Sequence, residues 1–267
     1  MNVALRNNVV AMGDGPNTLL FAHGFGCDQN MWRLLAPRFA DRFRVVLYDL
    51  TGSGRSDLAA YDRERHGTLH GHAADLLEVV EAFAAGPAVV VGHSVSAMIG
   101  MLATIEAPSR FAAQVMIGPS PSYIDDGDYV GGFSRADIDG LLDTMEGNYL
   151  GWSGTMAPAI MGAPDRPELG AELTNSFCRT DPEIAQHFAR VTFLSDHRAD
   201  VPRTRTPALV IQCSDDLIAP RAVGEWLHRA LPTSRLVVVD NVGHCPHLSA
   251  PHPTIDAIEA FLAETLR

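Results

Sequence analysis

The 267-residue chain has only four cysteines, and their spacing excludes two common uses of cysteine. Cys27, Cys178, Cys213 and Cys245 are too far apart for a Cys-x-x-Cys site, and they do not predict a disulfide framework. The N-terminal residues 1–8 lack an apolar core of the length that a signal peptide requires. We therefore expect a reduced, cytoplasmic setting for the protein.

Basic charge is also scarce in this sequence. Asp and Glu number 32 against 20 Lys and Arg, and the formal net charge at pH 7 is −12. This balance argues against a nucleic-acid partner, because phosphates are bound by Lys and Arg, and it disfavours an anionic membrane surface. The most apolar stretch, residues 88–105, is interrupted by Gly92, His93 and Ser94, so it does not predict a membrane span.

Hydrophobic patterning predicts an α/β protein. Apolar runs of strand length alternate with helical stretches, which is typical of a mainly parallel twisted sheet with helices on both faces. The N-terminal dozen residues are expected to add an antiparallel edge hairpin, with residues 13–16 as its turn. The predicted strands cover residues 18–24, 44–50, 88–93, 112–118, 207–213 and 234–240.

The segment Gly92-His93-Ser94-Val95-Ser96 is the most informative motif. It joins a predicted strand to a predicted helix. A serine at such a sharp turn has its hydroxyl above the sheet edge, at the positive end of the helix, and this arrangement is a nucleophile elbow. Ser96 stands where the motif usually has glycine, but only a small residue is needed where the helix and the strand approach each other.

The segment His23–Gly26 follows another predicted strand and is expected to supply part of an oxyanion hole. In an elbow enzyme, one backbone N–H comes from the residue after the nucleophile and one from the first loop. These residues are Val95 and Phe25, and the glycines beside Phe25 let its backbone turn inward. A dinucleotide site is excluded, because neither this segment nor residues 52–54 carry the third glycine of G-x-G-x-x-G.

A serine nucleophile needs a base within hydrogen-bond reach, and that base is oriented by a carboxylate. His244, in the loop after the last predicted strand, is the predicted base, and His247 is its competitor. Asp216 is the predicted acid, because it lies four residues before a proline that starts the next helix. Asp215 stays open as an alternative. The order of serine, acid and histidine along the chain is the one that elbow enzymes use.

Two histidine pairs have the spacing of metal ligands, His244-x-x-His247 and His70-x-His72. No carboxylate or cysteine at a recognisable spacing completes either set. We therefore expect no metal ion, and the chemistry requires no organic cofactor. Cys245, beside the predicted base, is expected to be a small buried space-filling residue rather than a redox-sensitive thiol.

Residues 119–199 interrupt the alternation of strands and helices. Helical stretches at 135–149, 152–161, 168–178 and 182–195 predict a four-helix lid over the nucleophile, with residues 1–118 and 200–267 as the core. Few charges lie among its apolar residues, which favours a small, largely apolar ligand. The expected pocket residues are Tyr123, Phe133, Leu141, Trp152, Met156 and Phe193, with Phe25 and Ile218 from the core.

Six segments carry a recognisable pattern: HGFGCDQNMW at 23–32, YDLTGSGRSD at 48–57, GHSVSAMIG at 92–100, DYVGGF at 128–133, EGNYLGW at 146–152 and GHCPHLS at 243–249. These segments resemble those of the RsbQ-like α/β-hydrolases, a family that includes the plant karrikin and strigolactone receptors. The similarity runs almost end to end and includes the lid. It implies the α/β-hydrolase fold with an inserted four-helix lid.

The resemblance also implies roles for single residues. Carried over by position, it names Ser94 as nucleophile, Asp216 as acid and His244 as base, with Phe25 and Val95 as oxyanion donors. The expected function is hydrolysis of a small, largely apolar, butenolide-like ester or lactone through an acyl-serine. The alternative is an RsbQ-like ligand sensor that activates a PAS-domain phosphatase in a stress-signalling pathway. Phe133, Trp152 and Phe193 fall where the family lines its pocket, and Met156 stands where plant members often have an aromatic residue.

Overall fold

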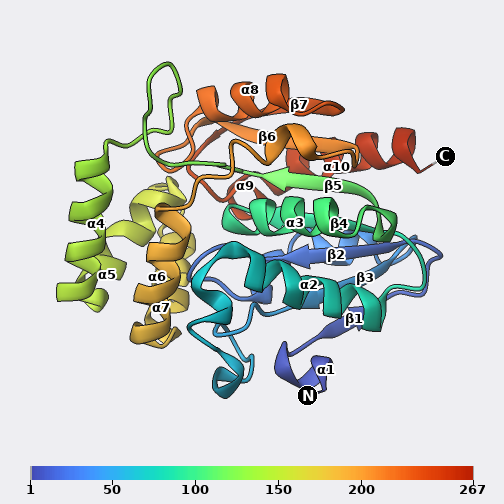
Figure 1. The fold of residues 1–267 in the computed structure, drawn as a ribbon, viewed down its shortest axis with the longest axis horizontal. Coiled ribbons are helices and arrows are strands. Elements are labelled where there is room, and N and C mark those ends of the chain that lie inside the picture. Colours follow the sequence, from blue (N-terminus) through green and yellow to red (C-terminus); the bar gives the residue numbers. More distant parts are fainter. Residues whose placement is uncertain (1, 267) are drawn as a thin grey trace.

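A seven-stranded sheet forms the centre of the computed structural model, which describes residues 2–266 (Figure 1). Its strand order is β1-β3-β2-β4-β5-β6-β7, and every neighbouring pair is parallel except β1 and β3. All the strands predicted from the apolar runs are present within a few residues, which confirms the α/β fold class. The strands are β1 (Val10–Met12), β2 (Thr18–Ala22), β3 (Arg44–Tyr48), β4 (Ala88–His93), β5 (Phe111–Ile117), β6 (Ala208–Asp215) and β7 (Ser234–Val242).

The N-terminal edge differs from the expected hairpin. β1 pairs antiparallel with β3, with Val10 opposite Leu47, and it does not pair with β2. The segment that follows β1 passes against the chain before β3, where a Cβ added at Gly13 or Gly15 would collide with backbone oxygens of residues 40–43. The chain therefore crosses the start of β3 on its way to β2, and the hairpin prediction is wrong.

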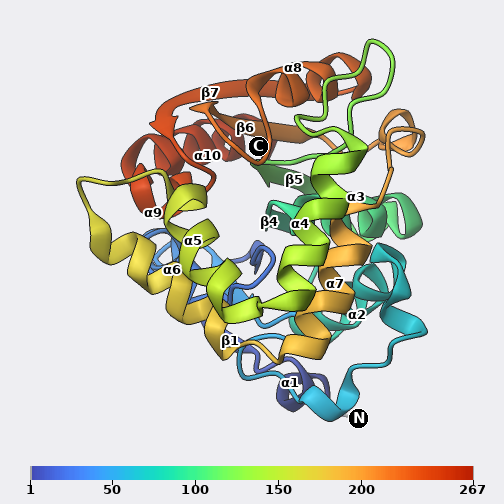
Figure 2. The ribbon, with the colours of Figure 1, turned by 90° about the vertical axis from the view of Figure 1, so that its left-hand side faces the viewer.

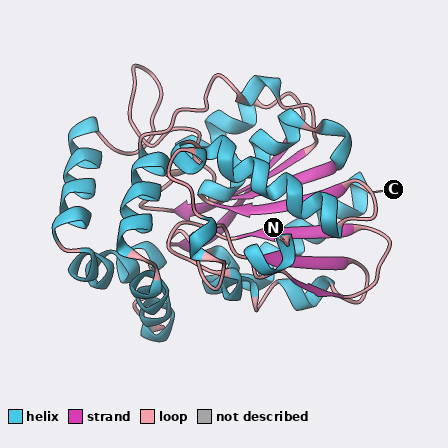
Figure 3. Cartoon of the chain, turned by 60° about the horizontal axis from the view of Figure 1, so that its bottom comes forward, coloured by secondary structure: helices cyan, strands magenta, loops and turns pink. Residues whose placement is uncertain are grey.

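Helices cover both faces of the sheet (Figure 3). α2, α3 and α8 pack on one face and α10 on the other. Successive strand residues point to opposite faces, so Leu20 enters the first layer and Leu19 the second. The helices are α1 (Val3–Arg6), α2 (Leu69–Phe83), α3 (Val95–Glu106), α4 (Arg135–Gly147), α5 (Tyr149–Met161), α6 (Pro167–Arg179), α7 (Pro182–Phe193), α8 (Arg221–Ala230), α9 (Pro246–Ser249) and α10 (Pro251–Thr265).

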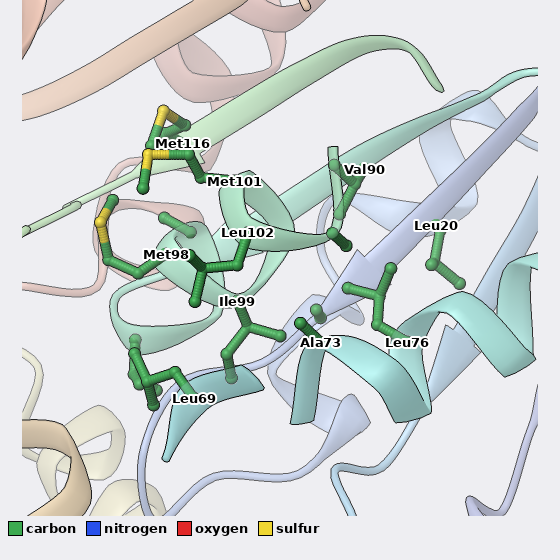
Figure 4. Packing of buried hydrophobic residues seen from close by; sticks show 14 of the residues in the cluster. Leu20, Leu69, Ala73, Leu76, Val90, Met98, Ile99, Met101, Leu102 and Met116 are labelled. Atoms are coloured by element: carbon green, nitrogen blue, oxygen red, sulfur yellow. The ribbon is translucent and has the colours of Figure 1, made fainter. Parts of the chain in front are cut away.

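The layer between α3 and the sheet positions the start of α3. Ile99 of α3 belongs to one buried cluster with Ala73 of α2 and Leu20 of β2 (Figure 4). A Cβ added at Gly100 would lie 3.1 Å from a methyl carbon of Val90, so α3 rests closely on β4. This close contact holds the first turn of α3 directly beyond the end of β4.

The helices α4–α7 lie together at the carboxyl ends of the strands. The arrows of β2 and β5 point toward them in Figure 1, and Figure 2 looks onto them from that side. Local caps explain where two of them begin: Ser134 and Asp137 form a capping box at α4, and the Asp181 side chain caps α7. Their apolar faces pack in a separate buried cluster that includes Cys27 and Cys245. Within residues 2–266, no helix is long and apolar enough to span a bilayer.

Candidate active site

Ser94 lies at the turn between β4 and α3 in a backbone conformation that few non-glycine residues adopt. Its φ is 56° and its ψ is −124°. Its N–H donates to the carbonyl oxygen of Ile117 on the neighbouring strand at 2.8 Å. Glycine is required at position 92, because a Cβ there would collide with the backbone of Ser96. The turn has the geometry of a nucleophile elbow, with Ser94 at the N-terminus of α3.

Ser96, which replaces the usual glycine of the motif, links two parts of the site. Its fully buried Oγ donates to the carbonyl oxygen of His23 at 2.5 Å. His23 begins the loop that carries Phe25, and His23 Nε2 accepts the N–H of Leu50 at 3.0 Å. The Ser96 hydroxyl therefore ties the Phe25 loop to the first turn of α3.

We expect Ser96→Ala to lower kcat by about tenfold with little change in KM. Removal of the hydroxyl frees the Phe25 loop, and an oxyanion donor contributes about 10²–10³-fold to kcat when correctly placed. The measurement is steady-state hydrolysis of a chromogenic ester, with a thermal melt to verify folding. Ser96→Gly, which restores the common motif, is the matched variant and should lose activity to a similar extent. Full kcat in both variants would contradict a positioning role for Ser96.

The backbone N–H groups of Phe25 and Val95 are available for an oxyanion. Val95 is the first residue of α3, so its N–H has no partner within the helix. Within residues 2–266, neither of these two N–H groups donates a hydrogen bond. Gly26, at φ +68°, has the ring of Phe177 where a Cβ would stand, so the loop needs glycine at this position.

His244 and Asp216 form a buried pair at the same edge of the sheet. His244 Nδ1 lies 2.7 Å from Asp216 Oδ2, and the two side chains are 5% and 0% exposed. Asp216 Oδ1 accepts the N–H groups of Ile218 and Ala219 at 2.8 and 3.1 Å. A carboxylate that accepts Nδ1–H leaves Nε2 as the proton acceptor. His244 Nε2 is buried and has no hydrogen-bond partner among the described residues.

The two alternative residues from the sequence lie elsewhere. Asp215 is exposed, and its backbone carbonyl accepts the N–H of Gly243 at 2.8 Å. His247 is fully buried and packs against Trp32 and His93, with ring centroids 4.8 and 4.4 Å away. The structure therefore brings Asp216, not Asp215, against the histidine of the loop, and that histidine is His244.

A cavity of about 30 Å³ lies beside Ser94 and His244. This volume is enough for about one water molecule. No Asp, Glu, Lys or Arg is among the described residues that line it. Four of the expected pocket residues line this cavity: Phe25, Trp152, Phe193 and Ile218. The other lining residues are Cys27, His93, Ile160, Leu173, Phe177 and Cys245.

Phe133, Leu141 and Met156 do not line this cavity, which corrects the expectation from the sequence. Phe133 is half-buried, and its N–H donates to the carbonyl oxygen of Tyr123 at 3.1 Å, which holds it in the loop before α4. Leu141 and Met156 are also half-buried and pack against the buried cluster of the α4–α7 helices. Apolar character alone did not separate residues that pack these helices together from residues that reach the cavity.

Tyr123 contributes to the site in another way. It is 2% exposed and packs on Phe193 with ring centroids 5.0 Å apart. Burial raises the pKa of the Tyr123 hydroxyl, and the influence of Ser94 partly offsets this rise. The phenol is therefore protonated, and Tyr123 is not among the described residues that line the cavity.

Several lining residues were not predictable as pocket residues from the motifs. Leu173 and Phe177 stand four residues apart on α6, a spacing that places both on one helix face and could have identified them. Cys27 and Ile160 carry no such signal. His93 and Cys245 were noted only as neighbours of Ser94 and His244, and the structure places them on the cavity wall.

A larger hollow of about 910 Å³ opens elsewhere, beside β1 and the segment 28–37. Two of its arginines are paired within the chain, Arg33 with Glu172 at 2.6 Å and Arg179 with Asp28 at 3.0 Å. No Ser, Cys or His is among the described residues that line it. It therefore offers no side-chain nucleophile of the kind found at Ser94.

Comparison with known proteins identifies the family. Residues 19–257 match the alpha/beta hydrolase family. The chain belongs to this family. The karrikin insensitive 2 receptor CA of Petunia hybrida is 38% identical over 253 residues, which cover 94% of each chain. Strigolactone esterase D14 of Arabidopsis thaliana is 38% identical over 251 residues, again 94% of each chain. The solved structure of a hydrolase from Oleispira antarctica aligns with a TM-score of 0.95 and 40% identity, covering 98% of this chain and 96% of that one.

These relatives confirm the resemblance that the motifs indicated, to the α/β hydrolases that include karrikin and strigolactone receptors. The similarity spans almost the whole chain in each case, so it includes the α4–α7 helices as well as the sheet. The protein is therefore an α/β-family hydrolase of the esterase type.

Proposed function

We propose that this α/β hydrolase cleaves a small, largely apolar ester or lactone by a serine mechanism. One observation carries the proposal: the buried 2.7 Å contact of His244 with Asp216, with His244 on the wall of the same cavity as Ser94. An oriented base beside an elbow serine is the arrangement that activates a hydroxyl nucleophile. No step requires a metal ion or an organic cofactor.

Acylation begins at Ser94. Its Oγ attacks the carbonyl carbon while its proton passes to His244 Nε2, and Asp216 stabilises the imidazolium that results. The carbonyl oxygen becomes an oxyanion that accepts the N–H groups of Phe25 and Val95, each contributing about 3–4 kcal/mol at the transition state. The tetrahedral intermediate collapses as His244 returns its proton to the departing alkoxide, which leaves acyl-Ser94.

Deacylation repeats these steps with water. His244 takes a proton from water, the hydroxide adds to the acyl carbon, and the proton then returns to Ser94 Oγ as the acid is released. For a lactone, the alcohol and the acid belong to one molecule, so the acyl intermediate still carries the alcohol. The single product is then a hydroxy acid.

The chemistry of the cavity wall supports a small apolar ligand. Aromatic and aliphatic side chains supply most of it, and no carboxylate or guanidinium faces the ligand space among the described residues. Trp152 lines this cavity and has one unused polar group, because its buried Nε1–H has no hydrogen-bond partner within residues 2–266. That donor suits a carbonyl or ring oxygen of the ligand.

Residues 119–199 act, in this proposal, as a lid over the core formed by residues 1–118 and 200–267. The cavity of about 30 Å³ is too small for an ester or a lactone, so a ligand is admitted only when lid side chains move. The closed position is held by the Ser176 hydroxyl, which donates to the carbonyl oxygen of Gly26 at 2.9 Å, and by the Arg33–Glu172 ion pair.

Phe177→Ala is expected to shift substrate preference toward longer acyl chains. The Phe177 ring lies on the cavity wall and stacks on Trp152, with centroids 5.5 Å apart. Because the fit of one methylene in an apolar pocket is worth about 1–3 kcal/mol, the kcat/KM ratio of a hexanoyl to an acetyl ester should rise about tenfold. Met156→Ala is the matched control, since Met156 lies in the same helical region without lining the cavity. An equal shift in both variants would contradict the assigned pocket.

A second function, a ligand sensor, is supported by the relatives. One is named a receptor and another an esterase, at the same 38% identity to this chain. In the sensor, ligand capture or slow hydrolysis would change the lid surface and so activate a partner, which for an RsbQ-like protein is a PAS-domain phosphatase. Both functions use the same triad, so the two are distinguished by the rate of turnover and by whether a protein partner is bound.

The test mixes the protein with a chromogenic short-chain ester and with a fluorogenic butenolide, and records product and intact mass. Sustained turnover that Ser94→Ala removes supports the hydrolase. A single burst that leaves a covalent adduct supports the same triad in a sensor. No reaction with either compound, or equal rates in Ser94→Ala, would contradict the proposal.

A further inference from the structure

A cluster of three metal-ligating side chains lies directly behind Ser94. It consists of His93 at the end of β4, Cys245 in the loop after β7 and His247 in α9. One donor nitrogen from each histidine and the sulfur of Cys245 all lie within 4.8 Å of one another. The three residues are 2%, 1% and 0% exposed. The proposed mechanism uses none of these side chains.

The donor atoms of this cluster have few partners. His247 Nδ1 and Nε2 and His93 Nδ1 are buried and have no hydrogen-bond partner among the described residues. His93 Nε2 lies 2.9 Å from the carbonyl oxygen of His244. Because a carbonyl oxygen only accepts, His93 Nε2 carries the proton and donates it to His244, which leaves the lone pair of His93 on Nδ1. Buried polar atoms without partners point to a bound water or ion.

We propose that His93, Cys245 and His247 form a three-ligand site for Zn²⁺, whose fourth position opens to the catalytic cavity. Binding forms two metal–nitrogen bonds and one metal–sulfur bond, releases the Cys245 thiol proton to solvent, and changes no oxidation state. Cysteine sulfur and histidine nitrogen are ligands that Zn²⁺ takes in proteins, and three protein ligands with an open fourth position are typical of catalytic zinc sites. Bonds of about 2.0–2.3 Å in a tetrahedron require donors about 3.3–3.8 Å apart, so the cluster must contract by about 1 Å.

The cavity provides the route to this site. His93 and Cys245 are on the wall of the cavity that also borders Ser94 and His244. A cation that reaches the nucleophile therefore meets two of the three ligands, and the remaining space holds about one water as the fourth ligand.

Metal binding at this site should affect catalysis, because the ligands are neighbours of the catalytic residues in the chain. Cys245 follows the base in sequence, His93 precedes the nucleophile, and His93 Nε2 bonds the carbonyl oxygen of His244. Contraction around a metal displaces both catalytic residues, so Zn²⁺ should inhibit hydrolysis. The inhibition rests on the proposed serine mechanism, whereas the metal site itself does not.

The experiment titrates metal-free protein with Cd²⁺, a zinc analogue whose bond to a thiolate gives an ultraviolet charge-transfer band. We expect one Cd²⁺ per chain and displacement by Zn²⁺. Cys245→Ser should remove the band, and His247→Phe, which keeps a ring against Trp32, should weaken binding about 100-fold. The matched control is Cys27→Ser, since Cys27 is the other cysteine on the cavity wall. Its band should be unchanged.

A second set of samples is refolded in the presence of Cd²⁺, so that a site that fills only during folding is detected.

Ser94→Ala separates this site from a metal held by the triad, and its Cd²⁺ affinity should equal that of the original protein. Absence of a band in both folded and refolded samples would mean that the cluster binds no metal, and this result would overturn the proposal. A band lost in Cys27→Ser, or unaffected by His247→Phe, would also overturn it. Because binding is measured without substrate, these outcomes do not depend on whether the protein hydrolyses esters.

Discussion

Ser94→Ala is expected to lower kcat by about 10⁴–10⁶-fold on any ester that the original protein turns over. The hydroxyl is the only group that the proposed mechanism uses to form the acyl intermediate, and loss of the nucleophile in serine hydrolases leaves only the contribution of the oxyanion donors. Intact mass after mixing should show no adduct in the variant. Product formation with a chromogenic ester gives the rate.

The fold of the variant is the control for this result. Alanine keeps the Cβ and meets the same backbone strain at φ 56°, so its thermal midpoint should lie close to that of the original protein. A folded variant that retains turnover after purification free of contaminating esterases would show that Ser94 is not the nucleophile. In that case Cys27, the other nucleophilic side chain on the cavity wall outside the proposed metal cluster, becomes the residue to test.

The strands were predictable because each inner strand is buried on both faces. A run such as Ala88–Val91 is apolar without alternation, and such runs are typical of parallel strands covered by helices. The sequence predicted β1 as an antiparallel edge strand, but it did not predict which strand β1 pairs with. Its three residues carry no pattern that distinguishes pairing with β2 from pairing with β3, and the crossing depends on contacts of Gly13 with residues 40–43.

The residues at the ends of strands were easier to place than the residues of the pocket. Parallel strands bring their carboxyl ends to one edge, so Ser94, Asp216 and His244 share a neighbourhood by topology. Asp215 and Asp216 are adjacent in the sequence, so both remained candidates for the acid. In the structure Asp216 is buried and contacts His244. Which residues line the pocket depends instead on how the helices pack on one another. The apolar character of a residue says little about that packing.

The histidine–cysteine cluster shows the same limit. His93 lies about 150 residues before Cys245 and His247 in the sequence, so ligand spacing within a motif could not reveal all three residues. They meet because the end of β4 lies against the loop that follows β7, as the bond of His93 Nε2 with the His244 carbonyl indicates. A cluster of this kind is visible only in three dimensions.

Asp216→Asn is expected to lower kcat by about 10⁴-fold while the protein stays folded. The reason is the way in which this side chain is held. Oδ1 accepts two backbone N–H groups, from Ile218 and Ala219, and these donors will retain the amide oxygen of an asparagine. The asparagine NH₂ group is then left to face His244 Nδ1, which must accept a hydrogen bond instead of donating one. The histidine proton moves to Nε2, where it prevents the ring from taking the proton of Ser94.

Asp215→Asn is the matched control, because it makes the same chemical change one residue earlier. Asp215 is exposed, and its contact with Gly243 uses the backbone carbonyl, which the substitution leaves in place. Its kcat should stay within about threefold of the original value, since exposed substitutions of this kind change little. Equal losses in the two variants would point to a general effect of charge near His244. A large loss in Asp215→Asn alone would reassign the acid, and with it the interpretation of the 2.7 Å contact.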